Sequence, residues 1–204
     1  MAVFGTHKQE RQEWELPAWD IARLFPSQGS WSEEDYLALN TPHLVEFTNG
    51  EVEVLPMPTD RHQSIVAYLF AVFAAYAAQI GGKVLFAPLR VRLGEGKIRE
   101  PDVVFLADAA DPRRQEEYWT GADLVVEVVS PDDPRRDLVT KRFEYAAAGI
   151  PEYWIVNPGA STITVLHLDG ERYAEHGSYG RGEIARSAHY PELTVAVADA
   201  LDAP

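Results

Sequence analysis

Two carboxylates and one lysine are the side chains of this sequence best suited to chemistry. Glu127 is the only charge in the apolar run 124–129, Asp102 precedes a second apolar run at 103–106, and Lys141 follows both. A buried carboxylate without a partner costs several kcal/mol. One or two carboxylates are a common binding site for Mg²⁺, which keeps several of its waters. The set therefore predicts a divalent-metal site that could support phosphodiester hydrolysis.

The roles expected of these residues follow from their chemical types. Asp102 and Glu127 would hold a Mg²⁺ or Mn²⁺ ion, and the backbone carbonyl of Val128 could add a third oxygen ligand. Lys141 would supply a positive charge that orients or activates the attacking water.

Each residue also has a structural interpretation. Asp102 could simply open a strand after Pro101, and Glu127 could pair with a structural arginine or histidine. Lys141 could form a surface pair with Asp137, one helical turn away, worth a few tenths of a kcal/mol.

A hairpin is expected at 44–55, because Asn49-Gly50 is a preferred two-residue turn. This register places Glu46 opposite Glu53, and opposed like charges are unfavourable. Either both carboxylates lie on a solvated face, or Glu46 points toward a cation and contributes to the metal site.

The remaining pattern predicts a core of one helix, three strands, a second helix and a further strand. The expected bounds are a helix from Thr59 or Asp60 to Ile80, strands at 83–93, 98–106 and 123–129, a helix at 134–148, and a strand at 152–157. On the second helix, Asp137, Lys141 and Glu144 share one stripe, and the apolar residues Leu138, Val139, Phe143, Tyr145 and Ala146 form the remainder. A short helix should precede the first hairpin, and a second hairpin should follow around Asp169-Gly170.

Composition limits the classes of protein that remain. The 204 residues suffice for one domain, expected at 32–204 after an N-terminal arm at 1–31. A net charge of −14 weighs against a broad basic nucleic-acid surface. The absence of cysteine excludes disulfides and thiolate metal sites. We expect a cytoplasmic protein without a membrane partner, since no secretory signal is visible and the apolar stretch 64–80 is short for a span.

An ordered series of motifs resembles a known family. It consists of Pro101-Asp102, the strand and Ser-Pro at 124–131, the helix residues 137–141, and the segment 145–158. Together with the hairpin around Asn49-Gly50 and with His62, this series is similar to the Uma-two family of PD-(D/E)XK, restriction-endonuclease-like proteins. The resemblance covers roughly residues 32–160.

The resemblance implies an α/β (α+β) fold with a central mixed β-sheet flanked by helices. It implies a divalent-metal site at Asp102 and Glu127, with Glu46 and His62 nearby and Asp137 as a further candidate. The parent motif carries its lysine two residues after the acid, where this chain has Val129. In the resembled family the lysine moves to the following helix, which corresponds to Lys141.

We therefore expect a Mg²⁺- or Mn²⁺-dependent nuclease acting on nucleic acid, with DNA favoured over RNA. Two alternatives stay open: a non-catalytic interaction or regulatory protein with the nuclease fold, and a hydrolase of small phosphate esters. The N-terminal arm and the C-terminal hairpin are candidates for the contacts of a homodimer.

Overall fold

A six-stranded mixed β-sheet forms the centre of the computed structural model, which describes residues 25–204. Its strand order is β10-β9-β8-β7-β6-β3. The neighbours β7 and β8 are parallel, and the other neighbouring pairs are antiparallel. The strands are β3 (Lys83–Phe86), β6 (Val103–Leu106), β7 (Leu124–Val128), β8 (Glu152–Asn157), β9 (Thr162–Asp169) and β10 (Arg172–Gly180).

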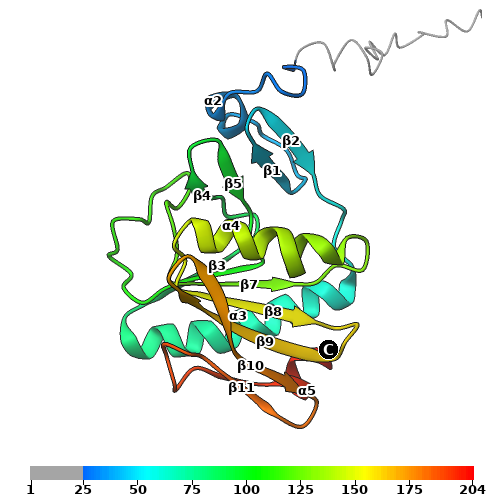
Figure 1. Cartoon of the computed structure of the whole chain (residues 1–204), viewed down its shortest axis with the longest axis vertical. Helices are drawn as coiled ribbons and strands as arrows, with labels where there is room; N and C mark the ends of the chain where they lie inside the picture. The colour runs from blue at the N-terminus through cyan, green and yellow to red at the C-terminus, as the bar shows by residue number, and fades with distance from the viewer. Residues whose placement is uncertain (1–24) are drawn as a thin grey trace, which may run out of the picture.

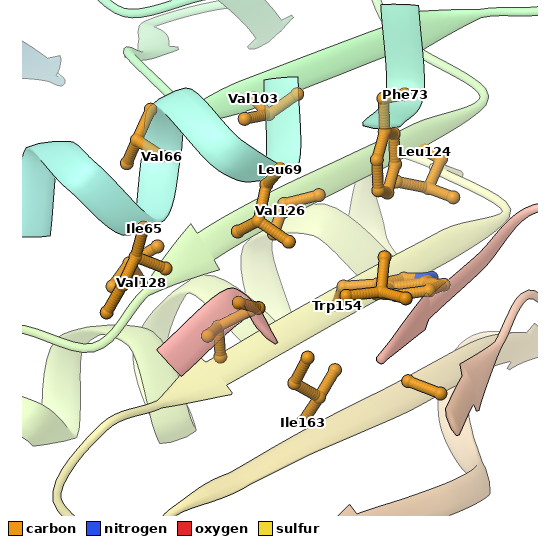
Figure 2. Packing of buried hydrophobic residues seen from close by; sticks show 14 of the residues in the cluster. Ile65, Val66, Leu69, Phe73, Val103, Leu124, Val126, Val128, Trp154 and Ile163 are labelled. Carbon is orange, nitrogen blue, oxygen red and sulfur yellow. The ribbon is translucent and has the colours of Figure 1, made fainter. Parts of the chain in front are cut away.

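Helix α3 (Asp60–Ile80) covers one face of this sheet. The side chain of Thr59 accepts a hydrogen bond from the His62 amide at its start, and Gly81 ends it in the left-handed conformation. Figure 2 shows Leu69 and Phe73 packed toward the strand residues of the large sheet. By length and composition alone α3 could cross a membrane, but its apolar stripe is the core contact of this fold.

The opposite face is covered by a second helical segment, made of the π-helical turn η1 (Arg136–Thr140) and α4 (Lys141–Ala147). Figure 1 shows α4 in front of the large sheet and α3 behind it. An apolar helix face normally faces the core, yet Phe143 is 64% exposed here, while Lys141 and Tyr145 are buried. The π-turn follows i→i+5 bonding, so 100° per residue does not describe this segment.

The two long strands expected at 83–93 and 98–106 are each split, which corrects the sequence prediction. Their outer halves are β4 (Val91–Gly94) and β5 (Lys97–Arg99), and they leave the large sheet. Pro88 and Pro101 lie in the two breaks, and proline has no N–H to donate to a strand ladder.

The outer halves join the first hairpin in a four-stranded sheet of order β2-β1-β5-β4. This hairpin is β1 (Val45–Thr48) and β2 (Glu51–Val54), and its predicted register is confirmed, including the pair Glu46 and Glu53. Figure 1 shows this smaller sheet at the upper end of the molecule, above α4. The bend therefore brings the hairpin next to the helix that carries Lys141.

The expected core order is confirmed by α3, β3, β6, β7, α4 and β8. The short helix before the hairpin is α2 (Glu33–Leu37), and β9 and β10 form the second hairpin. A two-stranded sheet of β11 (Ile184–Arg186) and β12 (Thr194–Ala196), with helix α5 (Val197–Leu201), completes the described chain. Most of the arm expected at 1–31 lies outside the described residues.

The orientation of α4 can be tested with two matched substitutions. Phe143→Ala should change the free energy of unfolding by no more than about 0.5 kcal/mol, because the ring is largely exposed. Phe73→Ala in α3 should lower it by about 3–5 kcal/mol, because that ring is fully buried. Urea denaturation of both variants measures the difference, and a large loss for Phe143→Ala would contradict the orientation.

Candidate active site

The ammonium group of Lys141 is the centre of the candidate site. Its side chain is only 4% exposed, and its Nζ lies 2.8 Å from Oε1 of Glu127, 3.2 Å from Oε1 of Glu46 and 3.6 Å from Oδ1 of Asp137. Burial disfavours the charged ammonium, but these carboxylates outweigh that effect and raise the pKa of Lys141. The lysine therefore stays charged and joins β1, β7 and η1 at one point.

Glu127 reaches this point from β7, on the face of the large sheet that α4 covers. Its neighbours along the strand on that face, Val125 and Val129, belong to the core beneath α4. Oε1 of Glu127 accepts hydrogen bonds from Lys141 and from the hydroxyl of Tyr145. Burial raises the pKa of Glu127, and although Lys141 opposes this, nearby carboxylates such as Asp102 add to it.

Asp102, which directly precedes β6, meets the end of β7. Its Oδ2 accepts a hydrogen bond of 2.7 Å from the Val128 amide, which fixes the carboxylate beside β7. His62 lies on the other side, with its Nε2 3.4 Å from Asp102 Oδ2 and 3.1 Å from the Val128 carbonyl oxygen. Burial lowers the pKa of His62, but these oxygens outweigh it and raise the pKa overall.

Glu46 points toward cations and not toward solvent, whereas its expected contribution to the metal site stays a prediction. Besides Lys141, it contacts Arg99, whose Nε lies 3.5 Å from its Oε2. Arg99 also binds both carboxylate oxygens of Glu144 at 2.8 and 2.7 Å, and Lys97 binds Glu144 at 2.9 Å. The cross-strand neighbour Glu53 is exposed and pairs with Arg136.

A narrow cleft of about 70 Å³ opens above these groups. Asp102, Glu127, Asp137, Lys141 and His62 all line it, and its walls come from segments 55–59 and 130–132 together with Arg136. Among the described residues near Lys141, Glu46 does not line the cleft and contacts Lys141 from β1. A solvent-borne ligand can thus reach the acids of the site.

The donor set suits a hard divalent cation. Oε2 of Glu127 accepts no hydrogen bond from the described residues, and neither does Oδ1 of Asp102. Glu46, Glu127 and Asp137 contact Lys141, and Asp102 lies near Glu127, so these four carboxylates outnumber the two cations Lys141 and Arg99. Between residues 25 and 204 no group of three His, Cys, Asp or Glu forms a ready metal site. A metal ion in this cleft would therefore have Asp102 and Glu127 as its protein ligands, and waters or substrate would have to complete its coordination.

Comparison with known proteins places the chain in a family. Residues 33–198 match the family Uma2, described as "putative restriction endonuclease". The chain belongs to the Uma2 family. This match confirms the resemblance seen in the sequence and extends beyond residue 160. The description supports a nuclease-like function for the chain.

A solved structure shares the Uma2-family fold seen here. It is described as a putative nuclease belonging to DUF820 from Anabaena variabilis ATCC 29413. The superposition has a TM-score of 0.68 at 18% sequence identity and covers 84% of this chain and 97% of that chain. The match supports the expected fold of a mixed sheet with flanking helices. A search of curated proteins found no match.

Three residues of the site were not among the sequence-based candidates. Tyr145 binds Glu127, Arg99 binds Glu46, and Glu144 in turn holds Arg99. Tyr145 lies four residues after Lys141, a spacing that places two side chains on one side of an α-helix. The sequence placed Tyr145 on the apolar part of the helix that Lys141 borders, but gave it no role in the site. Arg99 lies three residues before Asp102. Its contact with Glu46 could not be read from the sequence, because that contact depends on the break at Pro101 that places Arg99 in the smaller sheet.

The buried charge cluster predicts a pH-dependent loss of stability when Lys141 is replaced. Lys141→Met should lower the free energy of unfolding by about 3–5 kcal/mol at pH 8, since it removes the cation that Glu127 and Asp137 contact. The pKa of Glu127 is raised in the folded chain, whereas in the unfolded chain it stays near 4.5. Lys141 lowers this pKa, so its removal raises the pKa of folded Glu127 further. Between the unfolded and the folded pKa of Glu127 the folded variant binds more protons than the unfolded variant, so its stability falls as pH rises, and more steeply than that of the wild type.

Urea denaturation at pH 5.5 and pH 8 measures this dependence. The control Lys97→Met removes a more exposed ammonium, with 31% of its side chain exposed, and should cost no more than about 1 kcal/mol. Adding Glu127→Gln to Lys141→Met should restore part of the stability at pH 8. Equal losses at both pH values would contradict the account of the cluster.

Proposed function

We propose that this Uma2-family protein is a Mg²⁺- or Mn²⁺-dependent nuclease that hydrolyses phosphodiester bonds. The observation that carries the proposal is the pair Asp102 and Glu127, whose carboxylates line one cleft beside a buried, charged lysine. A bound Mg²⁺ would lower the pKa of a water ligand and offset charge on the phosphoryl oxygens. The family description, which names restriction endonucleases, favours DNA over RNA as the substrate.

Lys141 acts in this proposal as a fixed positive charge. Three carboxylates keep it protonated, so it cannot accept a proton from water and is not a general base. Its ammonium instead orients Glu127 and favours negative charge that develops on the phosphate during hydrolysis. The sequence alone left water activation open as a role, and the raised pKa of Lys141 argues against it.

Tyr145 and Arg99 are positioning residues. Tyr145 and Lys141 both donate to Oε1 of Glu127, which leaves Oε2 for a ligand. Arg99 binds Glu46, so that Lys141 is not the only cation balancing that buried carboxylate. These contacts fix the side chains before any metal or substrate binds, and such preorganisation is what an electrostatic catalyst requires.

One observation favours a non-catalytic nuclease-fold protein as a second candidate. Lys141 already neutralises part of the charge of Glu46, Glu127 and Asp137, which is the charge that a metal ion would otherwise offset. The net charge of −14 also opposes binding of a polyanion. Such a protein would bind no metal at the cleft and would turn over no nucleic acid.

The proposal predicts metal-dependent cleavage that requires Asp102. The wild type should cut DNA oligonucleotides in Mg²⁺ or Mn²⁺ and stop in a chelator. Asp102→Asn should reduce single-turnover cleavage at least about 100-fold, since even changes behind a metal ligand cost ~10–100-fold. The exposed control Glu171→Gln should cleave like the wild type.

The same assay should include an RNA oligonucleotide and a small phosphodiester. Cleavage of the small ester alone would support a hydrolase of small phosphate esters in place of a nuclease. Unchanged cleavage by a folded Asp102→Asn variant would contradict the site. A folded wild type that cuts none of these substrates would favour the non-catalytic candidate.

A further inference from the structure

A second, larger cavity lies directly beside the acidic cleft. Its volume is about 610 Å³, and it shares Thr59, His62, Val128 and Pro131 with the cleft. It opens at the carboxyl ends of β7 and β8, the parallel pair of the large sheet. In open α/β sheets, ligands commonly bind outside the carboxyl ends of parallel strands. The position of the cavity therefore suits the binding of a part of the substrate that lies next to the reacting group but does not itself react.

The walls of this cavity are apolar and conformationally stiff. Val128, the last residue of β7, and Val129 form one part of the wall, and three prolines form another, namely Pro131, Pro134 and Pro158. Proline has a fixed φ and no N–H, so this part of the wall offers a stiff apolar surface without backbone donors. Pockets of roughly 300–1,000 Å³ with apolar walls are typical of sites that enclose a small molecule or a large side group.

Four polar side chains stand among these apolar walls: Thr59 and His62, which are shared with the cleft, and Asn157 and Arg61. Oδ1 of Asn157 accepts a hydrogen bond of 3.0 Å from the Ala160 amide, while no described residue accepts from its amide nitrogen. Arg61, at the start of α3, is exposed and lines the same cavity. An amide donor at the edge of a flat apolar pocket suits the hydrogen-bonding edge of a planar, heteroaromatic ring.

The charge of the protein indicates why a nucleic-acid substrate would need such a pocket. The net charge is −14, and the cleft itself is lined by Asp102, Glu127 and Asp137. Contacts between basic residues and phosphates normally dominate nucleic-acid affinity, but here Arg61 and Arg136, which line the two cavities, stand against an excess of negative charge. Burial of a base against apolar surface provides binding that does not depend on phosphate charge.

We propose that this cavity, which we call the base pocket, holds one unstacked nucleobase of the bound strand. The inference rests on the proposed nuclease function and adds to it the form of the substrate. The shared wall of His62 and Val128 places the base next to the phosphate in the acidic cleft. Such a protein acts on single-stranded or locally opened nucleic acid, because a paired and stacked base cannot enter.

The first test is an abasic scan with the wild-type protein. A series of single-stranded oligonucleotides carries one abasic nucleotide, moved stepwise past the cleavage point. We expect one position at which kcat/KM falls by about 10- to 100-fold, the range typical of one stacked base, and little change elsewhere. A flat scan would overturn the proposal without any variant of the protein.

A variant that fills the pocket should produce the same loss. Ala160 is an exposed residue that lines the cavity, and Ala160→Trp places a large ring there. On the intact strand, the activity of this variant should fall about as far as the activity of the wild type falls on the abasic strand. On the abasic strand, the variant and the wild type should be equally active, because the pocket has no base to hold. The control Ala110→Trp, in an exposed loop, should behave like the wild type. If the loss caused by Ala160→Trp and the loss caused by the abasic nucleotide multiply when both are present, the base and the pocket act independently, and the proposal is overturned.

A binding measurement separates failure of this inference from failure of the proposed function. A single-stranded oligonucleotide with 2-aminopurine at the sensitive position, or at each position in turn, is titrated with wild type and Ala160→Trp in Ca²⁺. A fluorescence change in the wild type that Ala160→Trp abolishes supports the pocket even if no strand is cut, in which case only the nuclease proposal fails. Cleavage without any fluorescence change overturns the pocket alone, and absence of both overturns both.

Discussion

The structure depends on one constraint, which is the need to neutralise carboxylates that three separate elements bury at one point. Lys141 meets Glu46 from β1, Glu127 from β7 and Asp137 from η1. Buried charges are tolerated when they are paired and hydrogen-bonded, and Tyr145 and Arg99 complete the pairing. Removal of the central ammonium would leave several buried carboxylates that repel one another in a region of low dielectric constant.

The unusual features of the fold all serve this contact. The π-turn before α4 accompanies a helix that turns its polar stripe inward and leaves Phe143 exposed. The breaks at Pro88 and Pro101 divide a long hairpin between two sheets, and the smaller sheet carries Glu46 and Arg99 to the helix.

Local signals in the sequence were sufficient for much of the fold. The Asn49-Gly50 turn fixed the first hairpin and its register, and Thr59 and Gly81 marked the ends of α3. Glu127 stood out because a lone acid in an apolar strand needs a partner. The orientation of α4 and the contacts of Arg99 could not be predicted, because both depend on tertiary packing that overrides helical periodicity and strand continuity. Val129 in place of the motif lysine pointed to Lys141, and the structure brings that ammonium to within 2.8 Å of Glu127.

The central claim is that Asp102 and Glu127 hold a divalent cation beside Lys141. A calorimetric titration with millimolar Mn²⁺ on wild type, Glu127→Gln and the exposed control Glu51→Gln tests it most directly. Glutamine keeps the shape of the side chain and leaves Lys141 paired with Glu46 and Asp137, so the variant should fold. The account predicts binding in the wild type and in Glu51→Gln, and loss of binding in Glu127→Gln. Binding that persists in Glu127→Gln, or a folded wild type that binds no Mn²⁺, would contradict it.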